Sequence, residues 1–99
     1  MVHQKPSIPS PAHDPGARRF HLQLEGHEAE LTYHMREGTV MVIDHTGVPE
    51  AIGGRGIAGA LVQAAFDHAR AQGWTVVPAC SYAQAWVHRH AGYASLIEH

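Results

Sequence analysis

Apolar and polar residues alternate along two stretches in the first half of the chain. Residues 20–24 and 29–36 carry apolar side chains at every second position, the period of a half-buried β-strand. Glu37-Gly38 then forms a tight-turn dipeptide, which predicts a hairpin. Residues 39–43 are apolar on both faces, as in a central strand. We expect this strand to continue, with a bulge or bend, to Val48, where Pro49 ends it.

A helical period replaces the alternation after Gly56. Apolar residues fall on one stripe as far as Ala69, and polar residues fall on the opposite side. Gly73 is a typical helix stop. Residues 74–78 then predict a short strand. Strand, helix and strand at this spacing predict a βαβ unit, in which the last strand runs parallel to the strand that ends at Val48.

The two ends of the chain are less regular. Ser81 is predicted to cap a second helix over residues 82–90, and residues 93–97 are expected to form an edge strand or a coil. Residues 1–17 contain four prolines and are predicted to be a flexible, polyproline-like arm. The remaining residues, 18–99, are expected to form one compact α/β (α+β) domain with a mainly antiparallel sheet and one parallel junction.

Composition limits the classes of function. A chain of 99 residues makes one small domain, which a bound ligand or a partner subunit would stabilise. A net charge of −2 gives no reason to expect nucleic acid or an anionic membrane surface as partner. No membrane span or signal peptide is evident, and the single cysteine, Cys80, fits a reducing compartment. We therefore expect a cytoplasmic monomer or weak homodimer.

The stretch from Gly47 to Val62 is the centre of the functional prediction. A strand leads into it, a helix leads out of it, and the loop between them holds Gly53, Gly54, Gly56 and Gly59. Glycine lets a backbone approach a ligand closely. The first amides of a helix lack partners within it and lie at its positive end, so they suit an anion, most often phosphate. The alternative is that the glycines only permit a tight turn and close packing.

Gly54–Gly59 literally matches the dinucleotide pattern G-x-G-x-x-G. The next strand, however, ends in Val77-Pro78-Ala79-Cys80, without the carboxylate that binds a ribose, and the chain is too short for that fold. No Gly-Lys-Ser/Thr follows, so the loop is not a Walker loop either. The loop therefore matches neither of these nucleotide-binding motifs, and the packing alternative stays open at this point.

Residues 48–62 resemble the acetyl-CoA-binding motif of the GNAT superfamily of N-acetyltransferases. His45-Thr46 before them, Val77–Tyr82 after the helix, and His88-Arg89-His90 with Tyr93 add to the likeness, which is narrowest with the short, single-domain YjdJ-type branch. The resemblance covers residues 20–95. It implies a GNAT-like fold and acetyl transfer from acetyl-CoA to an amine of a small molecule or a protein. A non-catalytic CoA-binding or protein-interaction module is the alternative.

The resemblance also implies a cofactor site. No metal is expected, because His88 and His90 lie on different sides of a helix and no Cys or carboxylate completes a ligand set. Backbone amides from Arg55 to Ala60 would hold the CoA pyrophosphate, and the pantetheine arm would lie between the two parallel strands, beside Asp44–Val48. One position departs from the superfamily pattern, because Gly53 stands where Arg or Gln is usual. The cofactor-binding residues implied in this way are Thr46, Val48, Gly54, Arg55, Gly56, Ile57, Ala58, Gly59, Ala60 and Ser81.

Candidate catalytic residues lie near the ends of the parallel strands. Cys80 follows a strand end, where ligand sites of open α/β sheets lie, but a small buried hydrophobe is an equal reading. The resemblance favours a functional role, because the branch carries cysteine in a Pro-x-Cys-Ser-Tyr context. Tyr82 is a candidate acid with packing as an equal reading, and His45 and Glu50 are candidate bases that would more often be ordinary solvated residues. Direct transfer and an acyl intermediate on Cys80 both stay open.

Overall fold

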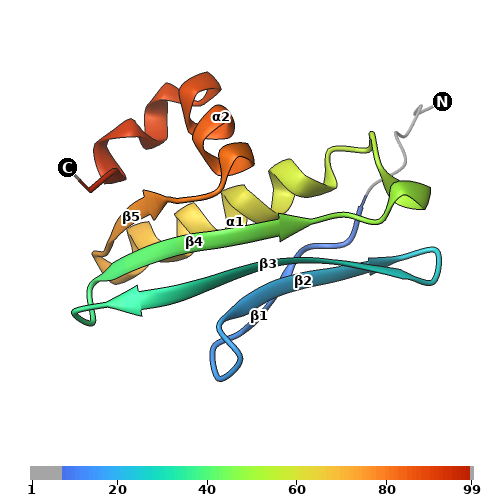
Figure 1. The fold of residues 1–99 in the computed structure, drawn as a ribbon, viewed down its shortest axis with the longest axis horizontal. Helices are drawn as coiled ribbons and strands as arrows, with labels where there is room; N and C mark the ends of the chain where they lie inside the picture. Colours follow the sequence, from blue (N-terminus) through green and yellow to red (C-terminus); the bar gives the residue numbers. More distant parts are fainter. Residues whose placement is uncertain (1–7, 99) are drawn as a thin grey trace, which may run out of the picture.

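The computed structural model describes residues 8–98, and the statements below concern that part of the chain. It forms an α+β domain with one mixed sheet, as predicted (Figure 1). The elements η1 and η2 are 3₁₀-helices. In chain order the elements are β1 (Ala12–Asp14), β2 (Arg19–Leu24), β3 (His27–Arg36), β4 (Val40–Gly47), η1 (Glu50–Ile52), α1 (Ile57–Gln72), β5 (Thr75–Pro78), α2 (Ser81–Arg89) and η2 (Ala91–Leu96).

The five strands lie in the sheet in the same order as in the chain. All neighbours are antiparallel except β4 and β5, which run parallel and are joined through α1. This arrangement confirms the predicted hairpin and βαβ unit. The predicted irregularity in β4 is a bulge: Thr32 pairs with His45 and Tyr33 with Ile43, which leaves Asp44 without a counterpart.

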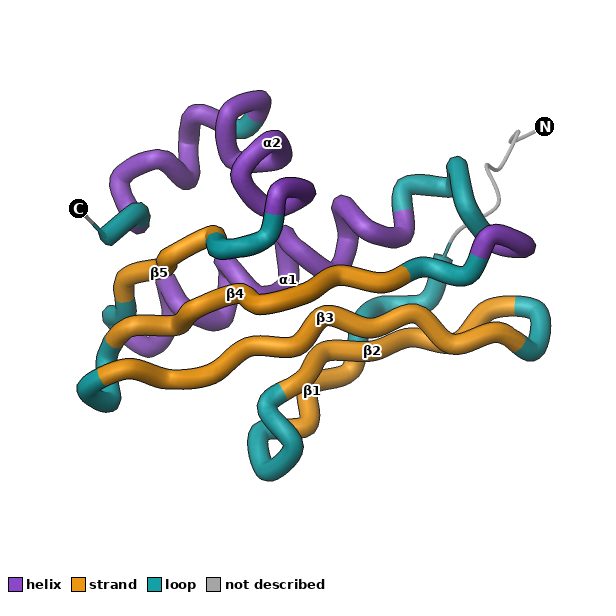
Figure 2. Tube along the Cα trace, in the orientation of Figure 1, coloured by secondary structure: helices purple, strands orange, loops and turns teal. Residues whose placement is uncertain are grey.

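The core lies between the sheet and α1, which runs beside the strands in Figure 2. Inward positions of β2, β3 and β4 meet the predicted apolar stripe of α1, whose Leu61 and Phe66 are fully buried. The helix α2 adds Trp86, whose ring lies 5.4 Å from that of Phe66. Among residues 8–98, no helix has the length and apolar character needed to cross a bilayer.

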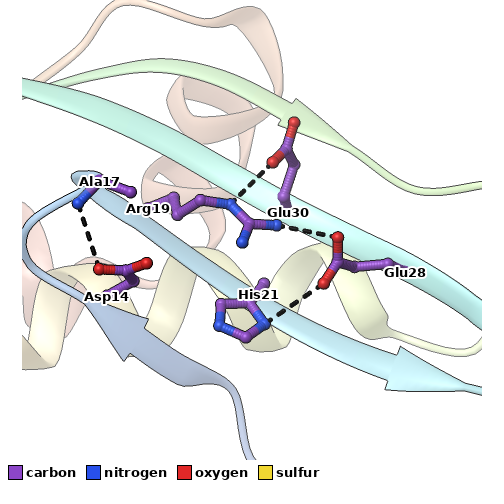
Figure 3. A network of polar contacts seen from close by, with 6 residues as sticks. All are labelled: Asp14, Ala17, Arg19, His21, Glu28 and Glu30. Carbon is purple, nitrogen blue, oxygen red and sulfur yellow. Dashed lines mark hydrogen bonds and ion pairs between the residues drawn. The ribbon is translucent and has the colours of Figure 1, made fainter.

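On the other face of the sheet, β2 and β3 carry polar side chains. Figure 3 shows Arg19 of β2 reaching across to Glu28 and Glu30 of β3, at 3.1 and 3.0 Å. The ring of His21 lies 3.5 Å from Glu28 in the same network. These cross-strand pairs suit a sheet face with no helix over it among the described residues.

The prediction of an irregular arm is wrong for residues 12–14, which form β1 against β2. His13 holds this strand in place, because its ring stacks on Phe20 at 4.2 Å and its Nε2 bonds the Tyr33 hydroxyl at 2.6 Å. Such contacts over a distance in sequence override local composition. The first part of the predicted arm, residues 1–7, lies outside the described residues.

Two predictions near the C-terminus are also wrong. Cys80, and not Ser81, caps α2: its sulfur accepts a hydrogen bond from the Ala83 amide at 3.4 Å. Residues 91–96 form η2 where an edge strand or coil was expected. Only Ile97 beyond it bridges to β5, through Val76.

Candidate functional site

The parallel strands β4 and β5 separate before β4 ends. Their ladder runs from the pair Val40–Thr75 to the pair Ile43–Pro78, while β4 continues to Gly47. The Ala79 amide donates to the Ile43 carbonyl at 3.0 Å, and the chain then turns into α2. The bulge at Asp44 stands where this separation starts. The sheet therefore opens a gap beside the last residues of β4.

The N-terminus of α1 lies at the same end of the molecule (Figure 1). Gly54 and Gly56 have φ of 75° and 79°, a left-handed conformation that favours glycine. Gly56 is the N-cap and offers no side chain, so no side-chain hydrogen bond caps this helix. The amides of Ile57, Ala58 and Gly59 consequently have no acceptor within the helix and remain as donors for a ligand.

A pocket of about 250 Å³ lies at the N-terminus of α1 and extends to Val48, directly after β4. Five of its lining residues belong to the predicted cofactor site, and a sixth, Tyr82, is the predicted acid. Its walls combine apolar side chains with the backbone of the glycine loop and of the first turn of α1, a composition suited to a ligand that carries both a phosphate and an apolar arm. The lining residues are Val48, Gly53, Gly54, Gly56, Ile57, Ala58 and Tyr82.

Two of the predicted cofactor residues, Gly59 and Ala60, lie in the first turn of α1. The Ala60 amide donates to the Gly56 carbonyl at 3.0 Å and is the first amide that α1 itself uses. A Cβ at Gly59 would lie 3.4 Å from the Tyr82 hydroxyl and 3.5 Å from Trp86 Nε1. Gly59 therefore lies on the side of α1 that faces α2, where a Cβ would make only ordinary van der Waals contacts.

Arg55, between the two left-handed glycines, makes an ion pair with the turn that joins β2 and β3. Its Nη2 donates to Glu25 Oε1 at 3.1 Å, and its Nη1 donates to Oε2 of the same carboxylate. Hydrogen bonding to Arg55 holds the pKa of the Glu25 carboxyl below its usual value, so this side chain is ionised at neutral pH.

Cys80 and Thr46 meet beside the pocket but do not line it. The Cys80 sulfur lies 3.6 Å from Thr46 Oγ1, in addition to accepting the Ala83 amide. Cys80 is half-buried, whereas Ser81 is exposed on the first turn of α2. The structure therefore gives Cys80 a capping role in the helix, next to the predicted acetyl-transfer site.

The predicted acid and bases are arranged unequally. Tyr82 is half-buried and lines the pocket. His45 and Glu50 are exposed and are not among the residues that line it. The Nε2 atom of His45 would lie 3.0 Å from a Cβ at Gly47, so this ring folds back along its own strand.

Sequence reasoning missed one polar pair at the bulge of β4. His34 Nδ1 lies 2.8 Å from Asp44 Oδ2, which joins β3 to the bulge of β4 on the polar face of the sheet. The alternation of β3 puts His34 on that face, but only the register across the bulge brings Asp44 beside it. Residues 8–98 contain no group of three or more His, Cys, Asp or Glu side chains that could hold a metal ion.

Comparison with known proteins agrees with this geometry. A family model described as GCN5-related N-acetyl-transferase matches residues 19–96. The NMR solution structure of a GCN5-like protein from Staphylococcus aureus superimposes with a TM-score of 0.66 at 28% identity. The match covers 82% of this chain and 81% of that protein.

Proposed function

Because the chain belongs to the GCN5-related N-acetyltransferase family, we propose that it acetylates an amine with acetyl-CoA as the donor. The observation that carries this proposal is the pocket at the N-terminus of α1. It combines unpartnered amides of Ile57 and Ala58, left-handed glycines that allow close approach, and an adjoining gap between β4 and β5. The free amides suit phosphate groups, and the gap between the strands suits an extended arm that carries amides.

The residues of the chain supply positions and proton transfers. Phosphates bind at the α1 amides, and the pantetheine arm pairs with backbone groups of β4 beyond Ile43, where β5 no longer does. A backbone amide near Val48 polarises the thioester carbonyl as the amine attacks. We assign the protonation of the departing thiolate to Tyr82, because this residue lines the pocket. His34, paired with Asp44 at the bulge where β4 and β5 separate, joins His45 and Glu50 as a candidate base.

We propose direct transfer to the amine, without an acyl intermediate on Cys80. Its sulfur is engaged with the Ala83 amide and Thr46, and Cys80 does not line the pocket. Replacement by serine keeps a helix cap and removes the thiol, so Cys80→Ser should retain acetyl transfer. Detection of an acetylated Cys80 by intact mass, together with loss of activity in Cys80→Ser, would establish the acyl route.

Calorimetry and thermal unfolding with CoA, acetyl-CoA and ATP test the cofactor directly. Acetyl-CoA and CoA should both bind and raise the melting temperature, because a ligand that binds the folded state stabilises it. ATP should bind more weakly, since it lacks the arm that fills the gap. Absence of binding by both CoA forms would refute the proposal. Activity over a panel of small amines, peptides with free N-termini and lysine peptides then identifies the acceptor class.

A non-catalytic CoA-binding or protein-interaction module is the second candidate. Two observations favour it. Gly53 lacks the polar side chain that is usual at its position, and the Arg55 side chain is already paired with Glu25. Binding of acetyl-CoA without turnover across the whole acceptor panel would support this module over the enzyme.

A further inference from the structure

The ion pair between Glu25 and Arg55 joins two segments that are 30 residues apart in the chain. Figure 1 shows the β2–β3 turn and the loop before α1 at the same end of the molecule. Each terminal nitrogen of the Arg55 guanidinium donates to a different oxygen of the Glu25 carboxylate. This bidentate geometry fixes the direction of the Arg55 side chain. The same bidentate geometry is what a guanidinium offers to a phosphate.

Arg55 is the only cationic residue between Val48 and Val62. Its neighbours Gly54 and Gly56 line the pocket, but its own side chain is not part of the lining. Arg55 therefore carries the positive charge that lies nearest in sequence to the proposed phosphate site, and this charge points to Glu25. An anion of the protein occupies the position that an anion of the ligand would seek.

The backbone fixes Glu25 in that position. Glu25 and Gly26 both have positive φ, 53° and 80°, and Leu24 pairs with His27 around them. This is the two-residue type I′ turn, for which Asn-Gly is the preferred sequence and glutamate is a poor first residue. The turn thereby directs the Glu25 side chain to a fixed place beside the loop that carries Arg55.

We propose that Glu25 is a built-in competitor for the cofactor phosphates, which holds Arg55 away from the pocket in the free protein and releases it when CoA binds. The inference rests on the proposed function, because it requires CoA to be the ligand. The exchange costs little, since both side chains are substantially exposed, 41% for Arg55 and 58% for Glu25, and exposed ion pairs contribute little to stability. Glu25 is thereby a residue that sets the affinity for CoA.

The chain provides a matched control for this proposal. Glu37-Gly38 repeats the Glu-Gly sequence in the β3–β4 turn, again with positive φ at both residues, 57° and 74°. Glu25→Asn and Glu37→Asn therefore improve the chemistry of a turn in the same way. Only the first removes the partner of Arg55, so the two variants separate an effect on the turn from an effect on the arginine.

The experiment measures CoA binding by calorimetry, with thermal unfolding of each variant to verify folding. Glu25→Asn should bind CoA about threefold more tightly, the size expected for loss of an exposed competing pair. Glu37→Asn should not change affinity. Arg55→Gln should bind CoA about fivefold more weakly, and adding Glu25→Asn to it should have no further effect.

Dephospho-CoA identifies the phosphate that meets Arg55. If the gain in Glu25→Asn persists with dephospho-CoA, Arg55 contacts the pyrophosphate; if the gain disappears, it contacts the 3′-phosphate. Unchanged or weaker CoA binding by Glu25→Asn would overturn the proposal, as would an equal gain in the Arg55→Gln background. Absence of CoA binding by every variant and by the parent protein would instead refute the proposed function.

Discussion

The two ends of α1 have the same backbone conformation and opposite hydrogen-bonding states. Gly56 before the helix and Gly73 after it have φ of 79° and 75°. At the C-terminal end, the Gly73 amide donates to carbonyls of the last turn, and the Trp74 amide donates to the Ala69 carbonyl at 2.8 Å. At the N-terminal end no side chain caps the helix.

Side chains repeat this contrast. Near the C-terminal end, Arg70 donates to the Gly92 carbonyl at 3.0 Å and lies over the Tyr93 ring at 4.5 Å. The Tyr93 hydroxyl donates to Asp67 at 2.7 Å, and this hydrogen bond raises the pKa of Tyr93. Identical glycine conformations thus complete a helix at one end and leave free donors at the other. The free donors are those that the proposed function assigns to the phosphates of the ligand.

The largest expected effect comes from substituting each of these glycines by alanine. A Cβ at Gly56 or Gly73 meets no atom within 4 Å, so each substitution costs backbone strain alone, about 1 kcal/mol. Urea unfolding should show similar losses of stability for Gly56→Ala and Gly73→Ala. Calorimetry with CoA should show weakened binding for Gly56→Ala only.

An equal loss of CoA binding in both variants would contradict a ligand site at the N-terminal end of α1. The loss would then result from lower stability and not from the position of the glycine. Normal CoA binding by Gly56→Ala would contradict such a site as well. Each variant is to be measured at a temperature where it is fully folded.

A smaller effect is expected from restoring the side chain that the superfamily pattern has at Gly53. This residue has φ of −69°, which any residue adopts, and a Cβ would lie 3.4 Å from the Glu50 carbonyl oxygen. Gly53→Gln should therefore fold normally and add one hydrogen bond at the pocket, which corresponds to about fivefold tighter CoA binding. Gly53→Ala is the control without the amide. Equal affinities of the two variants would show that this position does not reach the ligand.

The smallest effect concerns the strand β1, to which the proposed function gives no part in ligand binding. Burial lowers the pKa of His13, the nearby charge of His68 lowers it further, and Asp14 opposes both. A histidine whose folded-state pKa is lowered contributes stability above its unfolded pKa of about 6.5, and this contribution is lost as pH falls through the folded pKa. Protonated His13 and His68 would also repel each other across ring centroids 4.3 Å apart.

Urea unfolding of the parent protein and His13→Gln between pH 7.5 and 5 measures this effect. The difference in stability between them should shrink as pH falls below about 6.5. A constant difference over this range would contradict the assignment. CoA binding should change little in His13→Gln, which separates β1 from the open end of α1.

Local patterns in the sequence were sufficient for most of the fold. Alternation gave β2 and β3, the helical stripe gave α1, and the stop at Gly73 fell where the helix ends. Each of these elements turns one face to the same core. Its apolar residues therefore repeat regularly, every two residues in a strand and every 3.6 residues in the helix. The resemblance likewise named the loop whose residues line the pocket.

Features made by contacts between distant residues were not readable. The strand β1 depends on His13 stacking against Phe20, and its local sequence is rich in proline and polar residues. The pairs Glu25–Arg55 and His34–Asp44 depend on register and turn geometry. The cap at Cys80 was missed because serine, which follows it, is the commoner capping residue.

The match between strand order in the sheet and strand order in the chain has a consequence for folding kinetics. The strands β2, β3 and β4 each pair with the strand before them, so these contacts close short loops and should form early. Only β5 must wait for the whole of α1 before it reaches β4. We therefore expect its docking to be the last and slowest step. The gap between β4 and β5 would then be created by the final event of folding, so a chain stalled before that event would have a sheet and no binding site.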